Sequence, residues 1–232
     1  MPIHSSNPRS IPAFYSKLKL PNSECYWINT AGLRLLSISE LTTKEEKTEA
    51  TKFQHEGRRK QYLGIRAFLR DRGFAKGPIL NDEEGAPILD NTGSLSISHK
   101  ESICGFATSL DTSKISVGFD VETTNKEKKK LKEKFLNPEE QALAEKTIAT
   151  SICTEEQIYS MLFAAKEALF KAVFPIKRKR FYFESFHIES INMEQQRIEG
   201  TLQLDDLKKS LPIHFHISKE DNYVLACCEY AF

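Results

Sequence analysis

The stretch Ile115-Ser116-Val117-Gly118-Phe119-Asp120-Val121-Glu122 indicates the type of fold more directly than any other part of the chain. Apolar residues alternate along it with small or acidic residues, which is the pattern of a β-strand, so Asp120 and Glu122 lie on one face. Two carboxylates this close repel each other, and a hard cation such as Mg²⁺, which takes oxygen ligands, relieves the repulsion. An ordinary solvated strand face shows the same triplet, so the pair alone does not indicate function.

A second motif, Phe163-Ala164-Ala165-Lys166-Glu167-Ala168-Leu169-Phe170-Lys171-Ala172, has the period of an α-helix. At about 100° per residue its charged and aromatic residues share one arc, and its alanines and Leu169 fill the opposite arc. The small residues predict a helix whose backbone lies close to a neighbouring element. The other arc presents a carboxylate flanked by two cations, although a core helix with an ordinary Glu167–Lys171 pair has the same spacing.

These two motifs and the segments before them resemble the 4′-phosphopantetheinyl transferase superfamily, in particular the longer, two-lobed type that serves siderophore and peptide synthetases. The resemblance runs from about residue 58 to residue 172. Five segments carry it, in the order found in the family: Arg58-Arg59-Lys60-Gln61-Tyr62-Leu63-Gly64-Ile65-Arg66, Gly85-Ala86-Pro87, Ser94-Leu95-Ser96-Ile97-Ser98-His99, Gly118-Phe119-Asp120-Val121-Glu122, and Phe163 to Ala172. Ala86 stands where relatives often have Lys or Arg, and Phe163 replaces the tryptophan of some relatives.

The resemblance implies that Asp120, Glu122 and Glu167 ligate Mg²⁺, which also grips the pyrophosphate of coenzyme A. This agrees with the charge argument made from the strand alone. Glu167 would also be the general base for a serine hydroxyl, acting directly or through a metal-bound water. Lys171 would meet phosphate charge, and Lys166 is the second candidate for that role.

The resemblance also implies a binding site for the nucleotide end of coenzyme A. One of Arg58 and Arg59 would contact the 3′-phosphate, since guanidinium matches phosphate geometry, whereas Arg66 would pair within the fold. A histidine at the end of a strand is by itself an ordinary hydrogen-bonded residue, but in this family His99 would be a phosphate ligand with Ser98 as a neighbouring donor. Gly85 and Pro87 would shape the loop against the adenine.

The composition excludes some classes of protein. A formal net charge of +1 over 232 residues gives no global reason to expect a nucleic-acid or membrane-surface protein. The opening residues lack the apolar core of a signal peptide and no apolar stretch is long enough to span a membrane, so a soluble, cytoplasmic protein is expected, and we expect it to be a monomer. The five cysteines are odd in number and show no C-x-x-C or His-linked metal spacing, so they are expected to be reduced and buried. Two basic runs, Lys126 to Lys134 and Lys177 to Arg180, are read as solvated surface or as a patch for phosphates or an acidic protein.

The order of predicted elements indicates an α+β protein with two similar lobes related by a pseudo-two-fold, residues 1–122 and 123–232. Each lobe is expected to contain helices followed by an antiparallel sheet of three to four strands. After an irregular leader with a short strand around Cys25 to Ile28, the patterns predict these elements: a strand at 33–38, helices from a cap at Ser39 or Thr42-Thr43 to Gly73 with a break near Gly57, a meander of strands at 94–98, 103–109 and 115–122, helices at 137–149 and 154–173, and strands at 184–192, 197–204, 212–218 and 222–230.

The expected activity is transfer of 4′-phosphopantetheine from coenzyme A to a serine of an acyl or peptidyl carrier protein, with Mg²⁺ required. The alternative is a protein without catalysis that binds coenzyme A or nucleic acid through its basic runs. The lack of a recognisable RNA- or DNA-binding motif argues against nucleic acid.

Overall fold

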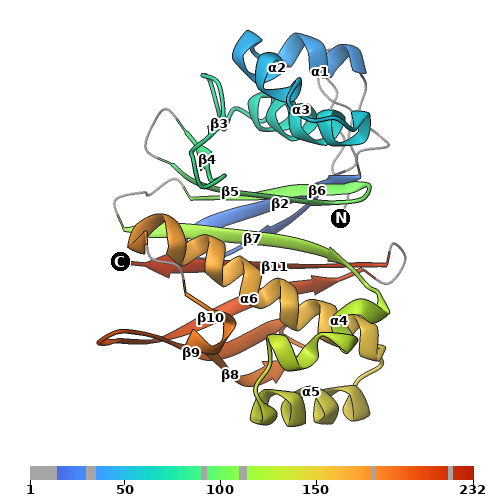
Figure 1. Ribbon diagram of the computed structural model, residues 1–232, viewed down its shortest axis with the longest axis vertical. Helices are drawn as coiled ribbons and strands as arrows, with labels where there is room; N and C mark the ends of the chain where they lie inside the picture. The colour runs from blue at the N-terminus through green and yellow to red at the C-terminus, as the bar shows by residue number, and fades with distance from the viewer. Residues whose placement is uncertain (1–14, 30–34, 90–92, 110–113, 179–180, 219–221) are drawn as a thin grey trace. The chain divides into compact units, whose positions relative to one another are not determined.

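The computed structural model describes residues 15–29, 35–89, 93–109, 114–178, 181–218 and 222–232 (Figure 1). The chain divides into two compact units, Met1–Lys114 and Ile115–Phe232. The sequence predicts a boundary after Glu122. The boundary falls earlier because the strand that carries Asp120 and Glu122 pairs with the last strand of the chain and therefore belongs to the C-terminal unit.

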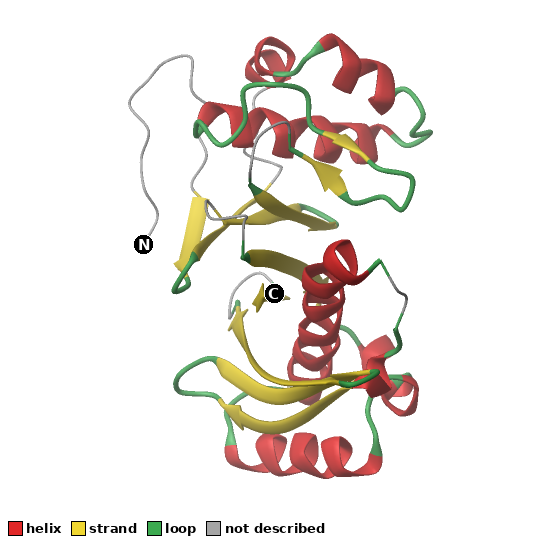
Figure 2. Cartoon of the chain, turned by 90° about the vertical axis from the view of Figure 1, so that its left-hand side faces the viewer, coloured by secondary structure: helices red, strands yellow, loops and turns green. Residues whose placement is uncertain are grey.

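The N-terminal unit has a four-stranded antiparallel sheet in the order β1-β2-β6-β5, with its helices on one face (Figures 1 and 2). Helix α3 packs Ile65, Phe68 and Leu69 onto Tyr26 and Phe106 of the sheet. The elements of this unit are β1 (Tyr15–Lys19), β2 (Ser23–Asn29), α1 (Leu35–Leu41), α2 (Lys44–Ala50), α3 (Glu56–Asp71), the two-residue strands β3 (Leu80–Asn81) and β4 (Pro87–Ile88), β5 (Ser94–Lys100) and β6 (Ile103–Ser109).

The prediction of a strand at residues 33–38 is wrong, because Leu35–Leu41 forms helix α1. The first two residues of the predicted strand, Leu33 and Arg34, lie outside the described residues. Ile38 is buried beside α3, and Leu41, three residues later, packs against the same core. That spacing is helical, and a short apolar run does not distinguish the two states by itself. The helix cap predicted at Thr42-Thr43 is confirmed, since Thr43 and Glu46 form a capping box at the start of α2.

The C-terminal unit has a five-stranded antiparallel sheet in the order β7-β11-β10-β9-β8, one strand more than expected. The strand at 115–122 does not continue a meander with β5 and β6, since it pairs with β11. Helix α6 lies along β7, β11 and β10 (Figure 1). The elements are β7 (Ile115–Thr123), α4 (Lys126–Lys130), the short 3-10 helix η2 (Lys132–Lys134), α5 (Pro138–Thr150), α6 (Glu155–Lys177), η3 (Phe183–Ser185), β8 (Phe186–Asn192), β9 (Arg197–Leu204), β10 (Leu207–Ile217) and β11 (Tyr223–Ala231).

The mixed helices and antiparallel sheets confirm the α+β class. No helix among the described residues is both long and apolar enough to cross a membrane. None of the five cysteines, all of which lie in described segments, forms a disulfide.

The two units repeat one internal arrangement, which the sequence alone did not show residue by residue. In each unit, a strand that precedes the helices in the sequence pairs with the strand that comes last in the sequence of that unit. These pairs are β2 with β6 and β7 with β11. In each unit a helix that begins with a capping box precedes a longer helix that packs on the sheet. The third residue of each capped helix is a buried glutamate, Glu46 in α2 and Glu140 in α5.

Each buried glutamate joins three parts of its unit through the same kinds of bond. Glu46 accepts the backbone N–H groups of Thr43 and Ile79 at 2.9 and 2.8 Å, and pairs with Arg70 of α3 at 2.7 Å. Arg70 also donates to the carbonyl oxygens of Leu41 and Gly77. This carboxylate therefore ties the start of one helix to the next helix and to the segment that follows it.

Glu140 repeats this set of bonds in the C-terminal unit. Its carboxylate accepts the N–H groups of Asn137 and Ile188 at 2.9 and 2.8 Å, and pairs with Lys166 of α6 at 2.8 Å. Lys166 also donates to the carbonyl oxygens of Phe183 and Phe186. Both side chains are only 1% exposed, so each charge depends on the other for compensation.

We expect Lys166→Met to lower the free energy of unfolding by about 3–5 kcal/mol, because it leaves the carboxylate of Glu140 buried without its cation. Urea unfolding followed by circular dichroism measures the loss. Lys146→Met is the matched control: Lys146 is exposed on α5, and its replacement should change stability by less than about 0.5 kcal/mol. The double variant Glu140→Gln/Lys166→Met should recover part of the loss, and equal losses for the Lys166 and Lys146 variants would contradict this account.

Candidate active site

The candidate site is built where strand β7 and helix α6 touch through their backbones. Gly118 shares one face of β7 with Asp120 and Glu122. A Cβ atom at Gly118 would lie 1.7 Å from the carbonyl oxygen of Ala168 and 2.7 Å from the backbone nitrogen of Ala172. No side chain fits there, so this face of the strand is pressed against the alanine arc of α6, as the sequence predicted.

The first charge pair of the site joins β7 to α6. The ammonium of Lys171 lies 2.7 Å from Oδ1 of Asp120. The carboxylate side chain is 7% exposed and that of the lysine is 29% exposed, so the lysine still contacts solvent. The structure therefore brings together two residues that are 51 positions apart in the chain and that the sequence assigned to one site.

The second charge pair involves a residue that the sequence analysis did not assign to the site. Lys128 of α4 lies 3.1 Å from Oε1 of Glu122, and its ammonium lies 3.3 Å from the centroid of the Phe163 ring. Asn125 begins α4 by accepting the N–H of Glu127, which turns the chain back towards the site. From the sequence, Lys128 is only one member of a basic run. One feature of the sequence could have distinguished Lys128 from the other lysines of the run. It lies six residues after Glu122, just beyond an asparagine that can cap a helix.

Glu167 completes the cluster, since the charges of Asp120, Glu122, Lys128 and Lys171 all act on the pKa of its carboxyl. Burial raises the pKa of the Glu167 carboxyl above its ordinary value, and the negative charge of Asp120 raises it further. Lys171 and Lys128 lower the pKa, and Glu122 adds a smaller upward effect. The net upward shift means that this carboxyl holds a proton more readily than a solvated glutamate does.

The cluster therefore consists of three carboxylates, Asp120, Glu122 and Glu167, compensated by the ammonium groups of Lys128 and Lys171. Within the described part of the chain, no three His, Cys, Asp or Glu side chains already lie in a metal-holding arrangement. The two lysines occupy the position of counter-charge that a divalent cation would take. Carboxylate oxygens are the ligands that suit Mg²⁺, so the donor chemistry of the cluster fits that ion.

Lys166, the second candidate for a phosphate contact, lies elsewhere. Its ammonium makes three bonds, to Glu140 and to the carbonyl oxygens of Phe183 and Phe186, and these match its three N–H donors. Burial lowers the pKa of Lys166, although the charge of Glu140 opposes this. The residue has the place in its unit that Arg70 has in the other, which indicates a structural role.

In the N-terminal unit, two of the predicted phosphate ligands lie together. Arg58 of α3 approaches Nδ1 of His99 on β5 at 2.7 Å. Because a guanidinium only donates, Nδ1 accepts and the proton of the neutral imidazole is on Nε2. Partial burial lowers the pKa of the Arg58 guanidinium. Ser98 precedes His99 on the strand and is buried.

Arg59 and Arg66 are engaged within the N-terminal unit. Arg59 donates to the carbonyl oxygens of Phe53 and Gln54 from an exposed position. Arg66 is 3% exposed and donates to the carbonyl oxygens of Ile79 and Tyr62 and to the side chain of Asn81. Its role within the fold is as the sequence suggested, and of the two arginines named for the 3′-phosphate, Arg58 is the one that lies beside His99.

Gly85 and Pro87 belong to the small β3–β4 hairpin. Gly85 has φ +87°, a left-handed conformation that glycine adopts without strain. Asp82 holds the turn by accepting the N–H groups of Glu84 and Ala86. The hairpin is therefore a defined loop rather than an irregular connection, and its role beside adenine stays a prediction.

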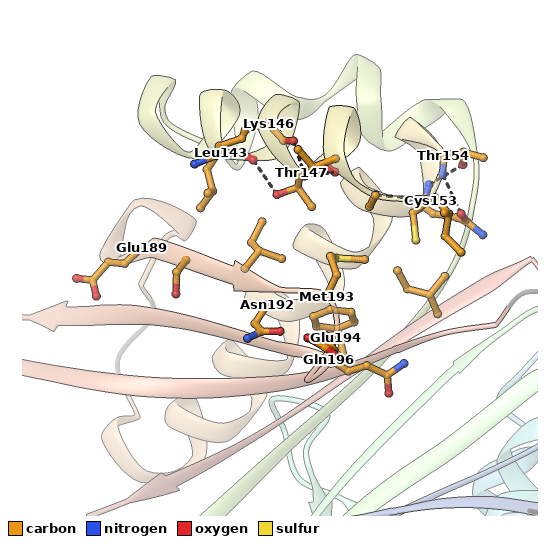
Figure 3. A pocket seen from close by; sticks show the side chains of 18 residues that line it. Leu143, Lys146, Thr147, Cys153, Thr154, Glu189, Asn192, Met193, Glu194 and Gln196 are labelled. Carbon is orange, nitrogen blue, oxygen red and sulfur yellow. Dashed lines mark hydrogen bonds between the residues drawn. The ribbon is translucent and has the colours of Figure 1, made fainter.

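A separate pocket of about 1150 Å³ lies in the C-terminal unit between the end of α5 and the β8–β9 turn (Figure 3). Thr147 and Cys153 line it on the helical side, and Met193 and Glu194 line it on the side of the turn. It shares no residue with the carboxylate cluster, and no predicted site residue contributes to it.

Residues 116–228 match the family model of the 4′-phosphopantetheinyl transferase superfamily. These residues span the C-terminal unit almost entirely and include both β7 and α6. The chain therefore carries a domain of the 4′-phosphopantetheinyl transferase superfamily, and transferase activity on carrier proteins is the general function of that class. A comparison with curated proteins finds no match.

We expect Gly118→Ala to lower the free energy of unfolding of the C-terminal unit by about 3 kcal/mol or more, since the added methyl would push β7 off α6 against backbone atoms. Denaturant unfolding measures this. In the control Gly57→Ala the new methyl has no atom within 4 Å at the start of α3, and the exchange should be neutral or stabilise by up to about 1 kcal/mol. A fully stable Gly118→Ala protein would show that the two backbones are not in contact.

The raised pKa of Glu167 predicts how stability depends on pH. The fold favours the protonated carboxyl, so stability is greatest below the ordinary carboxyl pKa and falls as the pH rises through the shifted value. Glu167→Gln mimics the protonated form and should therefore be more stable than the wild-type chain near neutral pH, with the difference vanishing towards about pH 4. Urea unfolding in EDTA across this range tests the sign; a less stable Glu167→Gln variant at neutral pH would contradict it.

Proposed function

We propose that this protein transfers the 4′-phosphopantetheine arm of coenzyme A to a serine of an acyl or peptidyl carrier protein in a Mg²⁺-dependent reaction. The observation that carries the proposal is the convergence of Asp120, Glu122 and Glu167 with Lys171 on the contact between β7 and α6. The superfamily of the C-terminal unit independently supports phosphopantetheine transfer in general.

Asp120, Glu122 and Glu167 would hold Mg²⁺ in this scheme. When bound, the ion supplies positive charge that stabilises the pyrophosphate oxygens and the charge that develops on the departing phosphate. Such transfers depend mainly on positioning and charge stabilisation, so no covalent intermediate with the protein is needed. Lys171, which is partly exposed, would turn from Asp120 to a phosphate oxygen.

Glu167 is the proposed general base. It would take the proton of the serine hydroxyl, either directly or through a water, while the serine oxygen bonds to the β-phosphorus of coenzyme A. The bond from that phosphorus to the bridging oxygen breaks, and adenosine 3′,5′-bisphosphate leaves. A carboxylate with a raised pKa is a stronger base than a solvated one, which suits this role.

Arg58 and His99 are the proposed contacts for coenzyme A phosphates in the N-terminal unit. Arg58 is an exposed residue, and because it donates to Nδ1 of His99, Nε2–H would be the phosphate donor of the imidazole. Ser98, Gly85 and Pro87 keep their predicted roles in the same nucleotide site.

The exposed lysines of the first basic run are the proposed contact for an acidic carrier protein. Lys126, Lys130 and Lys134 are exposed. Other members of the run are engaged within the unit: Lys128 pairs with Glu122, Lys129 with Glu155, and Lys132 with Glu145. These pairs reduce the charge that a nucleic acid would need, and Lys179 and Arg180 of the second run lie outside the described residues. We therefore do not favour the nucleic-acid alternative.

The proposal predicts that Asp120→Ala lowers the rate of carrier modification by about 10²-fold or more, the scale of a lost charge-stabilising group. The assay incubates the full chain with coenzyme A, Mg²⁺ and a panel of apo carrier proteins, and intact mass detects a phosphopantetheine-sized gain on a serine. Chelation by EDTA should abolish the gain.

Asp206→Ala, at an exposed turn position, is the matched control and should keep the wild-type rate. Unfolding measurements should show that Asp120→Ala remains folded, since its partner Lys171 is partly solvated. An Asp120→Ala protein that modifies a carrier at the wild-type rate with Mg²⁺ present would refute the assignment of the site.

A further inference from the structure

Lys128 has an unusual environment for a lysine in a basic run. Its side chain is 12% exposed, whereas Lys129 is 45% exposed and Lys132 is 27% exposed. Lys129 and Lys132 pair with glutamates of α6 and α5, away from the motif residues. Lys128 instead reaches Glu122, one of the three carboxylates of the candidate active site.

Two groups hold the ammonium of Lys128, and they differ in kind. Oε1 of Glu122 lies at 3.1 Å, and the face of the Phe163 ring lies at 3.3 Å from the ammonium to the centroid. Mg²⁺ prefers oxygen ligands, so it would take the carboxylate and not the ring. The quadrupole of the ring would still attract the ammonium. The ring itself is held by edge contacts with Phe135 and Phe183, at centroid distances of 5.3 and 5.6 Å.

We propose that Lys128 is an exchangeable counter-ion of the active site and a positioning residue for the reaction. In the protein without metal, its ammonium compensates Glu122. When a divalent cation takes Glu122, the ammonium stays on the Phe163 ring, and its charge then faces the diphosphate of the substrate. This role rests on the proposed function, because it assumes that Glu122 meets a cation and that the substrate carries a diphosphate.

The proposal explains why an aromatic residue at 163 is useful beyond filling space. Three carboxylates need positive charge before a metal arrives, or they repel one another and open the site. Once the metal is present, the ammonium of Lys128 has to leave Glu122 and still remain in the site. A lysine between a carboxylate and a ring meets both needs.

The proposed role of Lys128 can be tested by measuring Mg²⁺ binding and coenzyme A binding separately on the full chain. Lys128→Gln removes the competing charge, so Mg²⁺ measured by calorimetry without coenzyme A should bind about tenfold more tightly. With Mg²⁺ saturating, the same variant should bind coenzyme A about tenfold more weakly, because the diphosphate loses one facing cation. These opposite signs are not expected of a residue that only supports the fold.

Two variants and one control make the test specific. Lys128→Arg keeps the charge and should behave like the wild-type chain, and Phe163→Leu removes the ring and should weaken coenzyme A binding while leaving Lys128 free to pair with Glu122. Lys129→Gln is the matched control on the same helix, and neither affinity should change. Circular dichroism verifies that each variant is folded.

Weaker or unchanged Mg²⁺ binding in Lys128→Gln would overturn the counter-ion role, and unchanged coenzyme A binding would overturn the second half of the proposal. Both results leave the proposed function intact if the wild-type chain still modifies a carrier protein. A wild-type chain that binds neither Mg²⁺ nor coenzyme A would instead refute the proposed function and this role with it.

Discussion

The structure of the candidate site depends on one contact, the close approach of β7 to α6 at Gly118. With no side chain at this position, the strand lies against the backbone of Ala168, and the next residues on the same strand face, Asp120 and Glu122, are carried to the helix face that bears Glu167 and Lys171. Any side chain at Gly118 would force the two elements apart, because its Cβ would lie 1.7 Å from the carbonyl oxygen of Ala168. A constraint between backbones therefore sets the distances between the charges.

The C-terminal unit contains two kinds of charge cluster, and their surroundings explain their different roles. The pair of Glu140 and Lys166 is nearly inaccessible and is surrounded by hydrogen-bond partners, so its charges are committed to holding α5, α6 and β8 together. The cluster at Asp120 has an excess of carboxylates, and its partner Lys171 contacts solvent. Buried charge is tolerated only when it is compensated, and Lys128 and Lys171 supply that compensation here.

Much of the fold was predictable because its elements have strong periodic patterns. The strand through Asp120, the long helix through Glu167 and the late strands were predicted from alternation and helical spacing, and all are present. Helix α1 was missed because a short apolar run has no decisive period. The contact of Lys166 was not predictable for a different reason: its partner Glu140 comes from another helix, and spacing within one helix contains no information about such a partner.

By itself, the sequence determined the class of fold, the residues of the two motifs, and the face of each element on which they lie, because side-chain direction follows directly from the period of a strand or a helix. Only the tertiary structure decided which of the charged residues meet. It placed Lys171 on Asp120, turned Lys166 away into a structural pair, and brought Lys128 to Glu122 and the Phe163 ring. Such contacts depend on how closely elements pack and where each chain turns, and these distances are set by the whole unit rather than by local sequence.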